Sequence, residues 1–260
     1  MSGEGNAADP GVDLLLSSGF LAFARHAGVL AAIDAQGVAV NAVVGTSSGA
    51  LVGALWSAGM TPEAIGAALA EHPPWRFLRP TWTPWRGLLS LSPLLAWVRD
   101  RLPERFDQLP RPFAAGVVGM DGVPRLLTEG DLPSAVVASC AIPWLFQPIT
   151  AGGVAWQDGG VADRLMFAPW EAWRGRRRVL VHLVKRTGGV DSPVPLDGLP
   201  VVRTPRSGAS FFSLGDVAGS IALARSLAEA VIAEHALGGF RPGEGEERAA
   251  GGFRPPAGPS

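Results

Sequence analysis

The sequence predicts one α/β domain of three layers, with helices on both faces of a central, mostly parallel sheet. Short apolar runs alternate with segments of helical spacing through the first half of the chain. Hydrophobic residues make up 47% of the 260, which is enough for a substantial core. We expect the domain to span 12–240, between a flexible N-terminus (1–11) and a disordered tail (241–260) that has few apolar residues to bury.

The first half of the chain carries the alternation most clearly. Glycine, serine or a turn dipeptide ends each apolar run, and a three-to-four spacing marks each helix. The expected elements, in order, are a strand at Val12–Ser17, a helix at Phe20–Gln36, a strand at Val38–Val44, a helix at Ser48–Ala58 and a helix start at Thr61-Pro62-Glu63. Gly49 and Gly53 lie four residues apart, on one face of the helix expected at Ser48–Ala58. This spacing permits close packing of the helix against a strand.

The second half mixes helices, hairpins and a long irregular segment. Residues 72–92 are rich in Pro, Trp and Arg and show no clear period, as expected of a lid or a membrane-contacting loop. The other expected elements are a helix at Pro93–Leu102, a hairpin of Phe113–Gly119 and Pro124–Thr128, a helix from Asp131 through Ser139, strands at Gly153–Gln157 and Arg178–Val184, and a helix at Asp216–Leu237 behind a capping box at Ser213.

Composition narrows the class of protein. A net charge of −1 argues against a nucleic-acid binder, which usually carries a basic excess. Cys140 is the only cysteine, so no internal disulfide forms, which suits a reducing compartment. The sequence shows neither a signal peptide nor a good transmembrane helix. We therefore expect a cytoplasmic protein, with peripheral membrane contact as an option, and we expect no metal ion or cofactor.

Gly45-Thr46-Ser47-Ser48-Gly49 fits G-x-S-x-G, the pattern of a serine nucleophile on a sharp turn. Chance supplies roughly 0.3 such matches in a chain of this composition, so the pattern needs support from its surroundings. An apolar strand precedes it and a helical segment follows it. This context places the Ser47 hydroxyl at a sheet edge and a helix N-terminus, where backbone N–H groups favour developing negative charge.

A serine nucleophile needs a base, and the sequence leaves two types open. None of the four histidines lies on a glycine-rich loop after a late strand, and His182 lies within a strand. Asp158 follows a short strand and precedes Gly159 and Gly160, although Asp-Gly also marks ordinary turns. The chain order of Ser47, Asp158 and His182 also permits a triad of the α/β-hydrolase type.

Four segments together resemble the patatin-like phospholipases, serine acyl hydrolases that use a Ser/Asp dyad. They are "LLLSSGFLAFARHAGVLAAI" at 14–33, which contains the H-x-G-V-L element, Gly45–Gly49, "ASCAIPWLFQPI" at 138–149, and Asp158-Gly159-Gly160. The resemblance implies a patatin-like fold, Ser47 as the nucleophile, Asp158 as its base, and a lipid or lipid-like ester as the substrate.

The loop that should hold the oxyanion departs from the family pattern. The family's loop usually reads G-G-G-x-R/K-G, whereas Ser18–Phe23 keeps one glycine and lacks the basic residue. The resemblance implies backbone N–H donors from Gly19, Phe20 and Ser48. Phe20 would strain a backbone of positive φ, and Phe20 and Phe23 would narrow the acyl site. An alternative is therefore a patatin-fold protein of impaired catalysis that binds lipid or a partner.

The segment 72–92 alternates aromatic and basic side chains. Trp75, Trp82 and Trp85 alternate with arginines, which suits a surface that faces anionic lipid. The same tryptophans would equally fill a core beneath a long loop. The sequence alone leaves both interpretations open.

Overall fold

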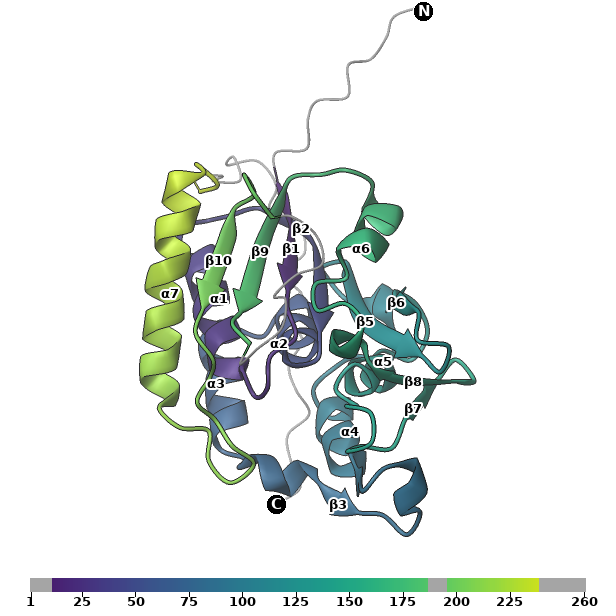
Figure 1. The fold of residues 1–260 in the computed structure, drawn as a ribbon. Helices are drawn as coiled ribbons and strands as arrows, with labels where there is room; N and C mark the ends of the chain where they lie inside the picture. Colours follow the sequence, from purple (N-terminus) through teal and green to yellow (C-terminus); the bar gives the residue numbers. More distant parts are fainter. Residues whose placement is uncertain (1–10, 187–195, 239–260) are drawn as a thin grey trace, which may run out of the picture.

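The computed structural model describes residues 11–186 and 196–238, and it confirms a three-layer α/β fold (Figure 1). Within these residues the main sheet has eight strands in the order β10-β9-β1-β2-β5-β8-β7, with β6 also on β5. The flexible N-terminus predicted for 1–11 (apart from Gly11) and the tail predicted for 241–260 lie outside the described residues.

The central part of the sheet is parallel, as the sequence predicts. Neighbouring strands here run in one direction, and their carboxyl ends meet at one edge. These strands are β10 (Val201–Thr204), β9 (Val179–Val184), β1 (Val12–Leu16), β2 (Val40–Thr46) and β5 (Phe113–Gly119). The antiparallel strands are β6 (Pro124–Leu127), β7 (Ile149–Ala151) and β8 (Val154–Asp158).

Alternating side chains of β1 show the two covered faces. Leu14 and Leu16 join a core cluster with α1 (Phe23–Ala35), α2 (Ser48–Ser57) and α7 (Val217–Glu234). Leu15 joins a separate cluster around Trp170 of α6 (Phe167–Arg174). Because successive strand residues point to opposite faces, the sheet is buried on both sides. Figure 1 shows α7 alongside α1 near the β10 edge.

Both glycines that the sequence places on one face of α2 lie close to the sheet. A Cβ on Gly49 would collide with the carbonyl oxygen of Leu16, and a Cβ on Gly53 would crowd the Val43 side chain. The helix therefore approaches the strands more closely than any larger residue would allow. This approach carries the N-terminus of α2 to the carboxyl edge of β1.

Short elements complete the fold. They are α3 (Pro62–Ala70), η1 (Pro74–Phe77), β3 (Arg79–Pro80), η2 (Pro84–Arg86), β4 (Leu89–Ser90), α4 (Ser92–Arg99), η3 (Phe106–Gln108), α5 (Leu132–Ala138) and η4 (Gly159–Val161). The predicted caps at Thr61 and Asp131 accept hydrogen bonds from Ala64 N and Ser134 N. No helix among residues 11–186 and 196–238 is long and apolar enough to cross a membrane.

The structure corrects several predicted boundaries. The first helix begins at Phe23 instead of Phe20, because the chain turns at Leu21, where φ is 49°. The last helix is capped by Asp216, which accepts from Gly219 N, and the capping box at Ser213 is absent from this helix start. β10 and α6 are absent from the elements expected from the sequence, because they are too short to show a clear period.

Candidate active site

Ser47 occupies a strained turn between β2 and α2. Its φ of 55° and ψ of −120° are rare for a residue with a side chain. Ser139 fixes this conformation: its Oγ accepts from the Ser47 N–H at 2.8 Å and donates to the Gly116 carbonyl at 2.6 Å. The glycines of the pentapeptide are required by space, since a Cβ on Gly45 would collide with the backbone of Gly49 and Ala50. The turn is therefore built to project one serine side chain.

The sheet register brings Asp158 to this turn. Thr46, the last residue of β2, pairs with Gly116 of β5, and Asp158, the last residue of β8, pairs with Val117. At both of these positions, the other edge of β5 is occupied by β6. Consequently β2 and β8 lie along the same edge of β5 and converge at their carboxyl ends. The proximity of Ser47 and Asp158 follows from this convergence, although the two residues are 111 positions apart in the sequence.

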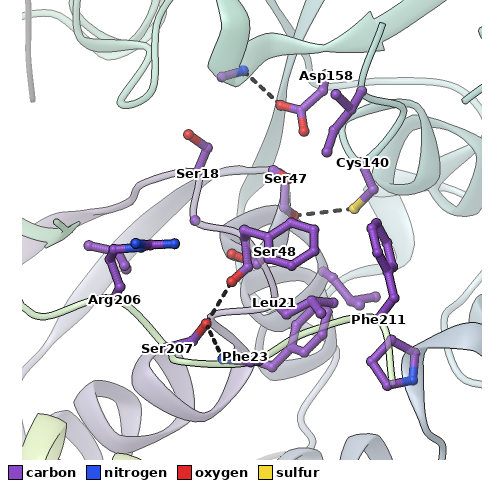
Figure 2. A pocket seen from close by; sticks show the side chains of 18 of the residues that line it. Ser18, Leu21, Phe23, Ser47, Ser48, Cys140, Asp158, Arg206, Ser207 and Phe211 are labelled. Atoms are coloured by element: carbon purple, nitrogen blue, oxygen red, sulfur yellow. Dashed lines mark hydrogen bonds between the residues drawn. The ribbon is translucent and has the colours of Figure 1, made fainter. Parts of the chain in front are cut away.

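The Asp158 carboxylate is 4% exposed and has defined hydrogen-bond partners (Figure 2). Its Oδ1 accepts from the Gly160 N–H at 2.8 Å, and the Ser47 side chain is a further partner of the carboxylate. Burial raises the pKa of Asp158 to about 6, and the bonds from Ser47 and Gly160 oppose this rise. A carboxylate of this pKa is a stronger base near neutral pH than an ordinary aspartate.

Gly19, Phe20 and Ser48, whose backbone N–H groups are predicted to hold an oxyanion, line the same pocket as Ser47. In the part of the chain that the structure describes, the N–H groups of Gly19, Phe20 and Ser48 donate to no protein acceptor. Ser48 is the first residue of α2, where N–H groups lack helical partners. The expected strain at Phe20 is wrong, because the positive φ of this loop falls on Leu21. The loop therefore turns at Leu21, and the backbone at Phe20 does not require a glycine.

The Arg164 side chain anchors the loop Ser18–Phe23 through hydrogen bonds. Its guanidinium donates to the Ser18 carbonyl at 2.7 Å, to Ser18 Oγ at 3.2 Å and to the Val184 carbonyl at 2.6 Å. The Ser18 N–H in turn donates to the Arg164 carbonyl at 3.0 Å. Arg164 is buried, and it ties the loop Ser18–Phe23 to the end of β9. A cation from a distant segment therefore lies against a loop that lacks its own basic residue.

The turn, the carboxylate and the loop border one pocket of about 360 Å³. Much of its wall is apolar, with side chains from α2, η1, α4 and the segment after α5: Leu51, Phe77, Leu94, Ile142 and Phe146. Phe20 and Phe23 also line it, as the sequence predicts. Among the described residues no three His, Cys, Asp or Glu side chains gather as around a metal ion.

Comparison with known proteins identifies the family. The model of the patatin-like phospholipase family matches residues 14–169, which contain the turn, the carboxylate and the loop. The chain belongs to the patatin-like phospholipase family. Two uncharacterized NTE family proteins, from Mycobacterium bovis and Mycobacterium tuberculosis, are each 32% identical to it over 167 residues. The match covers 63% of this chain and 46% of each relative, so the chain spans about half the length of these relatives.

A solved structure has the same fold. VipD from Legionella pneumophila superimposes on this patatin-like chain with a TM-score of 0.58 at 12% identity. The superposition covers 88% of this chain and 68% of VipD. The likeness supports the three-layer, patatin-like architecture predicted from the sequence.

The histidines of this patatin-like chain do not complete a triad with Ser47. His182 Nδ1 lies 2.8 Å from His26 Nδ1, and His182 Nε2 lies 2.9 Å from Thr204 Oγ1. His26 Nε2 lies 3.1 Å from Ser48 Oγ. Both rings are buried, and burial lowers the pKa of His26 to about 3 and that of His182 well below its usual value. Both nitrogens of His182 are thus occupied by groups other than Ser47 and Asp158.

Two residues of this arrangement have no signal in the sequence that marks them as part of the site. Ser139 lies within the A-S-x-A-I-P run of the family, but its contact with Ser47 depends on where α5 ends. Arg164 follows Asp158 by six residues, and no local pattern indicates that it reaches Ser18. Both act through long-range contacts, which a single sequence does not reveal.

Proposed function

We propose that the chain is a serine acyl-ester hydrolase of the lipid acyl hydrolase type, with Ser47 as nucleophile and Asp158 as base. One observation carries the proposal: a serine in a strained turn has a buried carboxylate as its side-chain partner at the convergence of β2 and β8. Strained turns of this kind expose a nucleophile at a sheet edge. The family supplies the expectation of a lipid substrate.

In the first half-reaction the Ser47 hydroxyl oxygen attacks the ester carbonyl carbon while Asp158 accepts the hydroxyl proton. The oxyanion that forms lies among the N–H groups of Ser48, Gly19 and Phe20. Collapse of this intermediate breaks the bond to the alcohol, which leaves with the proton from Asp158. The acyl group remains as an ester on Ser47.

The second half-reaction reverses these roles with water. Asp158 takes a proton from water, and the resulting hydroxide oxygen attacks the acyl carbon. The second oxyanion is held by the same donors, and Ser47 leaves with the proton from Asp158. Loss of one oxyanion donor typically costs about 10²–10³ in rate, so the geometry of the loop is central to this mechanism.

The test compares Ser47→Ala and Asp158→Asn with the native chain in hydrolysis of a short p-nitrophenyl ester and of a phospholipid. We expect both variants to lose hydrolysis while retaining native circular dichroism. Ser213→Ala, on an exposed loop, is the matched serine control and should keep its activity. Undiminished hydrolysis by Ser47→Ala would refute the proposal. A native chain without hydrolysis that still binds the lipid would instead favour the alternative of a lipid- or partner-binding protein.

We further propose that the tryptophan segment contacts a membrane surface. Trp82 is 97% exposed, Trp85 is 76% exposed, and Trp75 is half-exposed beside Arg76. The core-filling interpretation does not account for such exposure. Trp144, 87% exposed, lies in a segment next to this one, because its carbonyl accepts from the Leu88 N–H at 3.4 Å. Large exposed aromatic groups beside arginines suit the interface of an anionic bilayer.

Sedimentation with vesicles tests this surface. We expect the chain to bind phosphatidylglycerol-containing vesicles, and Trp82→Ala with Trp85→Ala to weaken binding. Trp173→Ala, at a half-buried position of α6 on the opposite face of the sheet, is the control. Equal binding by the double variant and the control would contradict the membrane role of the segment.

A further inference from the structure

The segment between β10 and α7, residues 205–216, contacts the predicted oxyanion loop, Ser18–Phe23. It lies outside the region that the family model matches, and it contributes Ser207 and Phe211 to the lining of the pocket. Both of these residues contact Phe20, which stands where the family's loop usually has a glycine. The mechanism proposed above does not use these contacts.

Two contacts hold Phe20. The Ser207 hydroxyl donates to the Phe20 carbonyl at 2.8 Å, and the Phe211 ring meets the Phe20 ring edge-on, with 5.0 Å between the ring centroids. The oxygen of the same hydroxyl accepts from the Ala209 N–H at 3.2 Å, and Figure 2 marks both bonds at Ser207. Because the Ala209 bond occupies a lone pair, the single hydroxyl proton is directed at Phe20. The segment therefore holds both the backbone and the ring of Phe20.

The backbone next to Ser207 is itself anchored. Arg25, a buried residue of α1, donates from its guanidinium to the Arg206 carbonyl and to the Ser220 carbonyl, each at 3.4 Å. Ser207 follows Arg206 directly in the chain. The hydroxyl that contacts the loop is thus attached to the helix that begins where the loop ends.

The loop contains a four-residue turn that is unusual for its sequence. The Ala22 N–H donates to the Gly19 carbonyl at 3.2 Å, and the third residue of the turn, Leu21, has a φ of 49°. A positive φ at this position alone marks a type II turn, in which glycine is the usual third residue. The type I form avoids the positive φ, and the two forms differ mainly in the orientation of the central peptide. A leucine at this position therefore favours the type I form on local grounds.

Ser207 opposes that change, because the central peptide of the turn joins Phe20 to Leu21. Its rotation into the type I orientation would turn the Phe20 carbonyl away and break the bond from Ser207. The Leu21 N–H donates to no protein acceptor within residues 11–186 and 196–238, so the other side of this peptide has no hydrogen bond of its own. The preceding peptide carries the Phe20 N–H, and its direction depends on the form of the same turn.

We propose that Ser207 is a positioning residue for the oxyanion loop. Its hydroxyl holds the turn Gly19–Ala22 in the type II form and thereby keeps the N–H groups of Gly19 and Phe20 in place for the oxyanion. This inference rests on the proposed function and adds a residue to it. Ser207 acts through the Phe20 carbonyl, so it should affect the rate of reaction more than the binding of the ester.

Steady-state hydrolysis of a short, neutral p-nitrophenyl ester by the full chain tests the inference. We expect Ser207→Ala to lower kcat by about ten-fold, the shift in a conformational equilibrium that one hydrogen bond produces, with KM nearly unchanged. Ser207→Thr, which keeps the hydroxyl, should recover most of this rate. Ser210→Ala is the matched control and should keep the native kcat, because its hydroxyl accepts from Phe212 and Ser213 within the same segment.

A glycine at Leu21 tests the turn itself. Glycine adopts a positive φ without steric strain, so the Leu21→Gly chain should keep the type II form even without the Ser207 hydroxyl. We therefore expect Ser207→Ala to lower kcat much less in the Leu21→Gly chain than in the native chain. An equal loss of kcat in the two chains would overturn the assignment of Ser207 to the turn.

The same measurements separate this inference from the proposed function. Native kcat in Ser207→Ala, with Ser47→Ala inactive, would overturn the positioning role alone. A raised KM at native kcat would make Ser207 a contact of the substrate and would also overturn that role. Absence of hydrolysis by the native chain would overturn the proposed function and, with it, the inference that depends on it.

Discussion

Ser47 and Ser139 are joined by a 2.8 Å hydrogen bond from the Ser47 backbone N–H to the Ser139 hydroxyl oxygen. This hydroxyl also donates to Gly116, so one side chain ties the strained turn to β5. A strained backbone persists only where its surroundings hold it. The position of Ser47 therefore depends on a residue at the end of α5, outside the G-x-S-x-G pattern.

Replacement of Ser139 by Ala should release this turn. The half-buried Ser47 N–H and the Gly116 carbonyl lose this partner, which costs about 1–3 kcal/mol of stability. We expect lower kcat for a neutral ester with a smaller change in KM, because the nucleophile is displaced and the pocket is intact. Urea unfolding and steady-state kinetics measure the two effects. Native kcat in a destabilised Ser139→Ala chain would show that Ser139 supports the fold alone.

The pH dependence of activity should report Asp158. The base must be deprotonated, and burial raises its pKa to about 6. We therefore expect kcat/KM for a neutral ester to rise with pH and to level off above about pH 7. A limb near pH 4, the value of an ordinary aspartate, would contradict the raised pKa of Asp158 in the free enzyme.

The same shift predicts a cost in stability. The folded pKa of Asp158 lies above its unfolded value, so the folded state favours the protonated carboxyl. Stability due to this group is therefore lost as pH rises from about 4 to about 6, and the loss stays constant above that range. Asp158→Asn removes this titration. We expect the stability of the variant, relative to the native chain, to increase across this window. A difference that does not change with pH would contradict the raised pKa.

Replacement of His182 by Ala should lower the stability of the fold without changing the reactivity of Ser47. His182→Ala removes the partner of His26 Nδ1 and of the Thr204 hydroxyl, and we expect a loss of about 1–3 kcal/mol in stability. Ser47 should still react with a fluorophosphonate in the folded variant, since His182 contacts neither Ser47 nor Asp158 among its hydrogen bonds. His235→Ala, whose ring contacts a backbone carbonyl on α7, is the control. A decrease of about 10⁴-fold in the labelling rate of folded His182→Ala would support the alternative triad of Ser47, Asp158 and His182.

Arg164 should affect the oxyanion loop more than substrate binding. Arg164→Met removes the donors to Ser18 and Val184 while keeping an unbranched side chain. We expect kcat to fall by about 10² with KM nearly unchanged, because the loop donors act most strongly on the oxyanion. Arg164→Lys, which keeps one cationic donor, should recover part of the rate. Equal losses in Met and Lys variants of unchanged stability would argue against this role.

The sequence predicts the fold better than it predicts the residues that hold the candidate site in position. The alternation of β1, α1, β2 and α2 follows from local periods, and the three-layer architecture and family are confirmed. The turn at Ser47 is also local, since its glycines and flanking elements are contiguous. Its approach to Asp158 comes from two strands sharing one edge of β5, a non-local register. Ser139 and Arg164 likewise act across the fold, which explains why no pattern indicated them. The roles of Ser47 and Asp158 stay predictions until they are measured.

Peptide mapping after reaction with a fluorophosphonate tests the central claim most directly. Mass spectrometry of the native chain should place one phosphonyl group on Ser47, within the peptide that carries Gly45–Gly49. The adduct should be absent from Ser47→Ala and slow to form on Asp158→Asn. A phosphonyl group on any other residue of the native chain, or equal labelling of Ser47→Ala, would contradict Ser47 as the nucleophile.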